Sequence, residues 1–177
     1  MPVVPYQPEN IQQPSELVAT IRHRRGGTLL NLDRMLLHSP PFAAGWNNFL
    51  NEVRNNLELP DNLRELAICT IAILNGAEYE FIQHAPEFLN TGGSREQLNK
   101  LQQIDHLTPN SLLFSETEKA VIQLSIEMTR SVKVEEATMS AVSNALQNDR
   151  HLVELIGVIA TYNMVSRYLV ALGIEPE

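Results

Sequence analysis

Cysteine is almost absent from this sequence, and its scarcity excludes several classes of protein. A single cysteine, Cys69, stands among 177 residues. It rules out a disulfide framework within one chain and fits a reducing cytoplasm. Paired histidines or cysteines at metal-ligand spacing, a phosphate-binding glycine loop and a G-x-S-x-G motif are missing as well. We therefore expect no metal site.

Positive charge is also scarce. The chain has 13 lysines and arginines against 21 aspartates and glutamates, which gives a net charge of −8 at pH 7. This balance argues against nucleic acid and anionic membranes as partners. The N-terminal stretch MPVVPYQPENIQQPSE lacks the basic start and apolar core of a secretory signal. We expect a cytoplasmic protein with no nucleic-acid or membrane partner.

Strand signals are missing, whereas helix start and stop signals are frequent. No run of alternating β-branched residues is bounded by tight-turn dipeptides. Prolines, glycine pairs and capping-box spacings instead mark the ends of helices. The sequence predicts an all-α protein with helices over about 15–23, 29–37, 42–53 and 60–75, a motif helix that ends at 91–93, two helices that begin at Ser94 and Ser115, and two final helices over about 135–147 and 150–172. The length suits one domain, which we place at 14–177, behind an N-terminal arm of residues 1–13.

Two predicted helices are more apolar than the surface of a small monomer allows. They are LRELAICTIAIL, from Leu63 to Leu74, and the terminal run LVELIGVIATYNMVSRYLVALGI. Polar residues interrupt the second run (Glu154, Asn163, Ser166 and Arg167), which argues against a membrane span. Helices that need cover on several sides in a small body favour burial against another subunit. We expect a homo-oligomer.

The stretch GAEYEFIQH holds the sharpest candidate pair, Glu80 and His84. Four residues apart on a helix, they share one face, together with Ala77. A carboxylate beside an imidazole can transfer protons near neutral pH. The alternative is structural, because acidic residues are favoured in the first turn of a helix and a half-buried histidine needs only one hydrogen-bond partner.

Two residues of the preceding apolar helix, Glu65 and Cys69, can likewise have either a catalytic or a structural role. Glu65 is either a buried carboxylate that relays protons to His84, or the third residue of a capping box that begins at Asn62. Cys69 lies inside the apolar run, and we interpret it as an inert core residue. Farther upstream, the cluster His23, Arg24 and Arg25 either binds an acidic group or forms a solvated helix end.

Glu65, Glu80 and His84 belong to a longer stretch that resembles the core of the carboxymuconolactone decarboxylase family, whose fold is shared with the AhpD alkylhydroperoxidases. The stretch is LPDNLRELAICTIAILNGAEYEFIQHAPEFLNTGGSREQLNKL. The resemblance rests on an Arg-Glu-Leu that enters an apolar helix, a glycine, an acidic-aromatic-acidic step, a histidine and a later glycine before a capped helix. These places are filled by Arg64-Glu65-Leu66, Gly76, Glu78-Tyr79-Glu80, His84 and Gly93-Ser94. The resemblance implies an AhpD-like helical bundle and a trimer or hexamer.

The sequence departs from both branches of that family. AhpD-type members carry a Cys-x-x-Cys pair where Ala77 and Glu80 stand here. A thiol peroxidase cycle needs an attacking and a resolving thiol, so the resemblance does not imply peroxidase activity for this chain. Decarboxylase-type members are more similar, with Glu at 80 and His at 84, although many of them have a cysteine where Ala77 stands.

The decarboxylase branch implies a cofactor-independent acid-base enzyme that acts on a small carboxylated or lactone substrate. In that scheme His84 donates or relays the proton, Glu80 orients the ring and Glu65 is a second relay residue. Tyr79 and Ala77 would line the substrate site, and either Arg64 or the pair Arg24 and Arg25 would bind a substrate carboxylate. The alternative is an oligomeric protein that binds a small acidic ligand without turnover.

Overall fold

The computed structural model describes residues 1–104 and 112–177, and within these residues the secondary structure is entirely helical. The fold class predicted from the sequence is therefore confirmed. Nine helices are described: α1 (Ser15–Arg24), α2 (Asn31–Leu36), α3 (Pro40–Asn55), α4 (Asp61–Leu74), α5 (Glu78–Asn90), α6 (Arg95–Leu101), α7 (Glu116–Arg130), α8 (Glu136–Leu146) and α9 (Asp149–Leu172).

The helices divide into two compact units. Unit 1 comprises Met1–Leu57 with Ala171–Glu177, and unit 2 comprises Glu58–Val170. The single domain at 14–177 behind an N-terminal arm stays a prediction, because compact units of this kind can also form within one domain. Residues 171–177 are grouped with the N-terminal helices, and this grouping follows how the chain packs.

Unit 1 contains α1, α2 and α3, and the N-terminal arm lies along its own chain. The backbone N–H of Val3 donates to the carbonyl of Leu172 over 2.9 Å. The backbone N–H of Glu175 donates to the Tyr6 hydroxyl, also over 2.9 Å. Residues of the predicted arm are thus tied to the C-terminal residues of the same unit.

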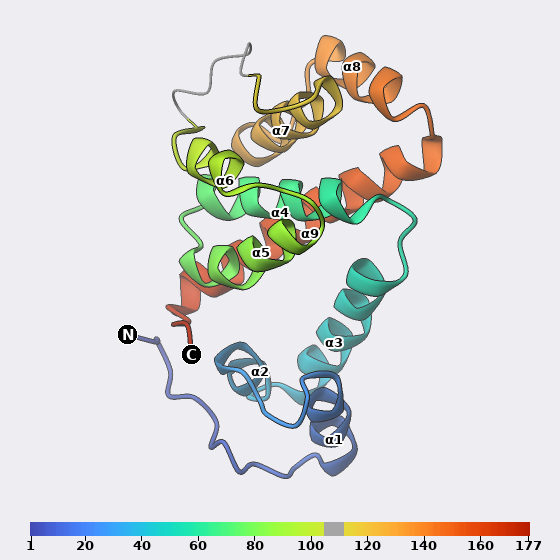
Figure 1. The fold of residues 1–177 in the computed structure, drawn as a ribbon. Helices are drawn as coiled ribbons and strands as arrows, with labels where there is room; N and C mark the ends of the chain where they lie inside the picture. Colours follow the sequence, from blue (N-terminus) through green and yellow to red (C-terminus); the bar gives the residue numbers. More distant parts are fainter. Residues whose placement is uncertain (105–111) are drawn as a thin grey trace. The chain divides into compact units, whose positions relative to one another are not determined.

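Unit 2 is built around α4. Every residue of α4 from Leu63 to Ala72 is buried, and the helix packs against α5, α6 and α7, with α8 on α7 (Figure 1). The apolar character of α4 is therefore used inside one chain. Our reason for expecting a second subunit over this helix does not hold, because neighbouring helices of the same unit supply its cover.

Capping residues set several helix ends where the sequence predicted them. Ser94 and Gln97 form a reciprocal capping box at α6, and Ser115 and Glu118 form another at α7. The spacing of Asn62 and Glu65 forms no such box, because α4 begins at Asp61 directly after Pro60. Glu65 therefore has no capping role in α4.

Helix α9 is long and apolar enough to cross a membrane by length and composition alone, and 44% of its most apolar window is buried inside the structure. Its buried side chains recur at helical spacing, from Leu155 through Val158 and Ile159 to Tyr162 and Leu169. This is the pattern of a helix with one face in a protein core.

Candidate active site

A tight turn places α5 back along α4 and creates the site. Gly76 has a φ of +62°, in the left-handed region that favours glycine. The N–H of Gly76 donates to the carbonyl of Ile73 over 3.2 Å, and the N–H of Ala77 to that of Ala72 over 2.8 Å. This pairing ends α4 in a Schellman motif, and α5 starts at Glu78. Residues far apart in the sequence can therefore meet across the two helices.

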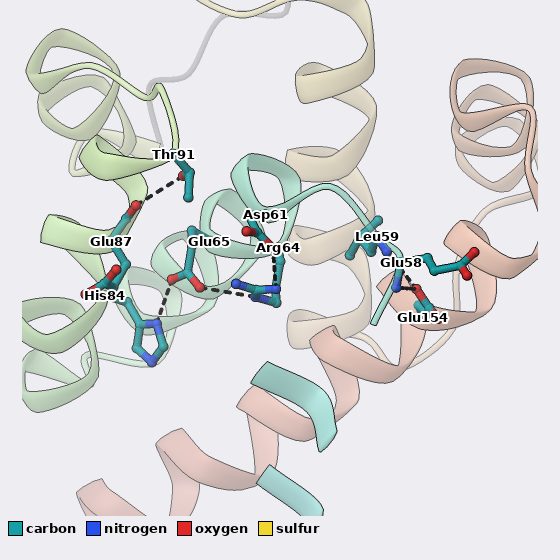
Figure 2. A network of polar contacts seen from close by, with 9 residues as sticks. All are labelled: Glu58, Leu59, Asp61, Arg64, Glu65, His84, Glu87, Thr91 and Glu154. Carbon is teal, nitrogen blue, oxygen red and sulfur yellow. Dashed lines mark hydrogen bonds and ion pairs between the residues drawn. The ribbon is translucent and has the colours of Figure 1, made fainter. Parts of the chain in front are cut away.

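Glu65 and His84 are the residues that meet. The Nδ1 atom of His84 lies 2.7 Å from Oε2 of Glu65, across 19 residues of sequence (Figure 2). Both side chains are buried, with 4% and 6% of their surface exposed. The carboxylate therefore fixes the orientation of the imidazole and leaves Nε2 as the ring nitrogen on the side away from Glu65.

Arg64 holds the second oxygen of the same carboxylate. Its Nε donates to Oε1 of Glu65 over 3.2 Å, and its Nη1 donates to Asp61 over 2.6 Å (Figure 2). Burial raises the pKa of Glu65, but the hydrogen bond and charge of His84, together with Arg64, outweigh burial and lower that pKa below its ordinary value. Glu65 is thus held ionised between two basic groups.

Glu80 lies on α5 one turn before His84 and is held by α9. Ser166 Oγ lies 3.1 and 3.2 Å from the two carboxyl oxygens of Glu80, and 2.6 Å from the carbonyl of Tyr162. Ser166 is fully buried and Glu80 is 2% exposed. The single hydroxyl proton is shared among these acceptors, so Ser166 fixes the position of the Glu80 carboxyl. The ring of Tyr162 meets that of His84 edge-on, with centroids 5.0 Å apart.

Ser166→Ala is expected to lower the free energy of unfolding by about 1–3 kcal/mol, because it removes a hydrogen-bond partner from a buried carboxyl group. Urea denaturation measures this change. Ser125→Ala is the matched control: Ser125 is equally buried in α7, but its hydroxyl donates to the carbonyl of Val121, four residues earlier, over 2.8 Å. The control is expected to change stability by less than about 1 kcal/mol. Equal losses in both variants would contradict a special role for Ser166.

The structure brings Glu65 and His84 together. The Nδ1–H of His84 donates to Glu65, so Glu65 orients the ring, while the orienting role expected of Glu80 stays a prediction. Tyr79 and Ala77 are buried, at 5% and 2% exposed, and Ala77 is the N-cap of α5. Whether these two residues line a substrate site stays a prediction.

Ser166 was not among the predicted site residues, although the sequence carried a signal for it. It interrupts an apolar helix, and a buried hydroxyl needs a partner. Asn163, another interruption, accepts from Asn75 over 3.1 Å and donates to Thr129 over 2.9 Å. The polar interruptions of an apolar helix thus mark its contacts with neighbouring helices.

Cys69 is fully buried and lies near the carboxylates of Glu65 and Glu80. Burial and the negative charges of Glu65 and Glu80 raise the pKa of its thiol. The thiolate is the reactive form of cysteine, so this environment makes the thiol inert. The interpretation of Cys69 as a core residue agrees with its position.

Native Cys69 is expected to resist iodoacetamide and a disulfide reagent for hours, because both need an exposed thiolate. The measurement is a mass shift, followed over time in buffer and in denaturant. The denatured chain should gain one label, since the sequence has one cysteine. Labelling of the native protein at the rate of the denatured chain would contradict the buried, protonated state.

Within residues 1–104 and 112–177, no group of three or more histidine, cysteine, aspartate or glutamate side chains is placed to hold a metal ion. The chemistry that the described site offers is proton transfer by His84 and its carboxylates.

A family model matches part of the chain. Residues 40–109, fewer than half of the 177, match the model described as the carboxymuconolactone decarboxylase family. The resemblance found in the motif residues is therefore confirmed for this segment, which includes Glu65, Glu80 and His84. No curated protein matches this sequence significantly.

Two crystal structures show that the chain has an AhpD-like fold. One is an uncharacterized peroxidase-related protein from Silicibacter sp. TM1040, with a TM-score of 0.78 and 16% identity over 99% of this chain and 90% of that chain. The other is described as the alkylhydroperoxidase AhpD core of an uncharacterized peroxidase-related protein from Ralstonia eutropha JMP134, with a TM-score of 0.80 and 14% identity over 98% and 91%. At these identities the likeness concerns the fold alone, not the activity.

Proposed function

We propose that this protein is a cofactor-independent acid-base enzyme, a decarboxylase or related lyase, that acts on a small carboxylated or lactone substrate. The buried pair of His84 Nδ1 and Glu65 Oε2, 2.7 Å apart, carries the proposal. A carboxylate that fixes one ring nitrogen prepares the other to give or take a proton. The inert Cys69 favours this chemistry over a thiol cycle.

The proposed step is loss of CO₂ from a carboxylated lactone. The bond between the ring carbon and the carboxylate breaks, and its electron pair moves into the adjoining unsaturated system to give a dienolate. Protonated His84 then donates one proton to carbon through Nε2 and regains a proton from solvent before the next turnover. Glu65 stabilises the positive charge of His84 before the transfer, and it accepts a hydrogen bond from Nδ1–H throughout.

Substrate binding needs a cation, and Arg64 is our candidate. Its Nε and Nη1 contact Glu65 and Asp61. A guanidinium has five N–H donors, so further donors remain for a substrate carboxylate. The contact with Glu65 would place that carboxylate next to the proton relay.

A turnover assay tests the proposal on a panel of carboxylated lactones and β-keto acids, following substrate absorbance and released CO₂. The double variant Glu80→Gln/His84→Ala is measured beside the parent. Turnover by the parent that is lost in the variant supports acid-base catalysis. Full activity of the double variant on a substrate that the parent consumes would overturn it.

The second candidate function is binding of a small acidic ligand without turnover. One feature of the helix face shared by Ala77, Glu80 and His84 favours this function. Ala77 and Glu80 stand where AhpD-type proteins have their two thiols, so the binding site could remain in a protein that has no thiol chemistry. Binding of panel compounds with no product, retained in the double variant, would favour this function.

We also propose that the chain forms a homo-oligomer through α9. Val153, Gly157, Ala160 and Met164 are exposed and fall at helical spacing on one side of this helix. A charge in that stripe, Met164→Glu, is expected to shift the protein to monomer in size-exclusion chromatography with light scattering. Val170→Glu adds the same charge to α9 outside the stripe and should leave the oligomer intact. A monomeric parent would contradict the proposal.

A further inference from the structure

The buried pair of Glu65 and His84 is connected to the protein surface through two further side chains. Oε1 of Glu65 accepts a hydrogen bond from Nε of Arg64 over 3.2 Å, and Nη1 of Arg64 donates to Oδ1 of Asp61 over 2.6 Å (Figure 2). All four residues lie in unit 2, three of them on α4 and His84 on α5. Asp61 is thus the last member of a hydrogen-bonded chain that ends at the histidine, and the proposed enzyme function gives it no role.

Exposure to solvent falls from Asp61 inward. The Asp61 side chain is 64% exposed and that of Arg64 is 11% exposed, whereas Glu65 and His84 are buried. A guanidinium with so little solvent around it needs carboxylates to compensate its charge. Arg64 has two of them, Glu65 at Nε and Asp61 at Nη1. The exposed aspartate therefore supplies part of the compensation for a nearly buried cation.

Asp61 decides how the positive charge of Arg64 acts on the buried pair. With Asp61 in contact, part of that charge is balanced at the surface end of the chain. Without Asp61, the charge would act undivided on Glu65 and on the protonated form of His84 beyond it. A positive charge disfavours a second one nearby, and an arginine held more tightly by Glu65 weakens the support of that carboxylate for the imidazolium. Loss of Asp61 therefore disfavours protonated His84.

The alternative is that Asp61 serves only the start of α4, because an acidic residue in the first turn is favoured by the helix dipole. Helix α7 offers the same arrangement without a buried histidine. Glu116 in its first turn forms an ion pair with Lys119, three residues later, over 2.7 Å. Among the described residues this is the one ion pair of Lys119. The dipole effect is common to both helices, whereas a link to His84 belongs to Asp61.

We infer that Asp61 is a positioning residue for His84, which acts through Arg64 and Glu65. Its carboxylate holds Nη1 of Arg64, so that Nε stays on Glu65 and Glu65 stays on Nδ1 of the ring. The same contact balances part of the arginine charge and favours the protonated imidazole. The effect on the ring follows from the contacts alone, whereas its kinetic consequence rests on the proposed function, in which protonated His84 is the proton donor.

Titration of the His84 ring tests this role without any substrate. The Cε1–H resonance of the ring is followed by NMR on the full chain between about pH 5 and 9, and its absence from the spectrum of His84→Gln identifies it. In Asp61→Asn, which removes the charge at nearly constant size, the midpoint of this titration is expected to fall by about 0.3–0.5 pH units. Asp61→Glu keeps the carboxylate and should return the midpoint toward that of the parent.

Glu116→Gln is the matched control, since it removes an ion pair of the same spacing at the start of another helix of unit 2. It should leave the midpoint of the His84 titration within about 0.1 pH units of the parent. High salt adds a second control: because Asp61 is exposed, the difference between Asp61→Asn and the parent should shrink at about 1 M salt. The other titratable and charged groups around the pair are the same in all these proteins: Arg64, Glu65 and Cys69 on α4, Glu80 on α5 and Tyr162 on α9.

An unchanged His84 titration in Asp61→Asn, or an equal change in Glu116→Gln, would overturn the role of Asp61. On a substrate that the parent consumes, the loss of kcat toward high pH is expected to begin at lower pH in Asp61→Asn, in step with the ring titration. A lowered midpoint in a protein that consumes no compound of the panel would support the positioning role and count against the proposed function. Turnover by the parent with an unchanged midpoint in Asp61→Asn would support the function and overturn the positioning role.

Discussion

Replacing His84 with glutamine is expected to lower kcat on any substrate that the parent consumes by about 10²–10⁴-fold. Glutamine keeps a polar side chain near Glu65 but cannot hold and release a proton near neutral pH. The loss should fall on kcat more than on KM, because the transferred proton matters in the transition state and not in binding. Steady-state kinetics on the best compound of the panel measures it.

His151→Gln is the control for this prediction. His151 lies near the start of α9 in unit 2, and the hydrogen bond described for it uses its backbone N–H, which donates to Asn148. Its replacement should leave kcat within about twofold of the parent, as expected for a side chain outside the proton path. A His84→Gln protein that folds like the parent and keeps its kcat would remove His84 from the chemistry.

Replacing Glu65 with glutamine is expected to lower the free energy of unfolding by about 3–5 kcal/mol at pH 7. Glutamine has nearly the same volume, so the effect comes from charge. Glu65 is the carboxylate between Arg64 and His84, and its removal leaves two buried basic groups with less compensation. Chemical denaturation followed by circular dichroism measures the change.

The same variant gives a pH dependence with a definite sign. Because the folded-state pKa of Glu65 lies below its ordinary value of 4.5, the ionised carboxylate stabilises the folded state above about pH 4.5. This contribution is lost as the pH falls through the folded-state pKa. The stability difference between parent and Glu65→Gln should therefore be full at pH 6–7 and shrink below about pH 4.5.

Glu78→Gln provides the matched control for Glu65. Glu78 lies in the first turn of α5, is exposed, and contributes through the helix dipole. Its replacement should cost less than about 1 kcal/mol. If Glu78→Gln and Glu65→Gln lose the same stability, the buried relay is not the source of the effect.

Helix ends could be predicted from the sequence because local chemistry fixes them. Ser94 with Gln97 and Ser115 with Glu118 formed the capping boxes that their spacing indicated. Asn62 with Glu65 did not, since the N-cap of α4 is Pro60, two residues before Asn62, and Glu65 contacts His84 instead. The capping-box spacing is defined within one helix, so it cannot predict a partner from another helix, such as His84 for Glu65.

The site was predictable only in part for the same reason. The common face of Glu80 and His84 follows from helical geometry, whereas a contact between Glu65 and His84 depends on how α4 and α5 pack, so the sequence left it open beside a capping role. Ser166 is 86 residues from Glu80, and no local pattern connects the two. The buried polar residues of apolar helices were the available signal, and their partners become known only when the helices are packed.

Burial of α4 also shows how a sequence argument about oligomers can mislead. An over-apolar helix indicates that cover is needed, and the sequence does not say whether the cover belongs to the same chain. For α4 the cover belongs to the same chain, because α5, α6 and α7 pack against it. The exposed stripe on α9 is the remaining basis for an oligomer.

We propose that this chain transfers protons through the buried pair of His84 and Glu65, and that its one thiol takes no part in the chemistry. The most direct test measures consumption of the carboxylated lactone panel and of an organic hydroperoxide by the parent, Cys69→Ala and His84→Gln proteins. We predict that Cys69→Ala keeps the lactone turnover of the parent and that His84→Gln loses it. We also predict that Cys69→Ala leaves the rate of hydroperoxide consumption unchanged, because the thiol takes no part. Hydroperoxide consumption by the parent that disappears in Cys69→Ala would contradict the account.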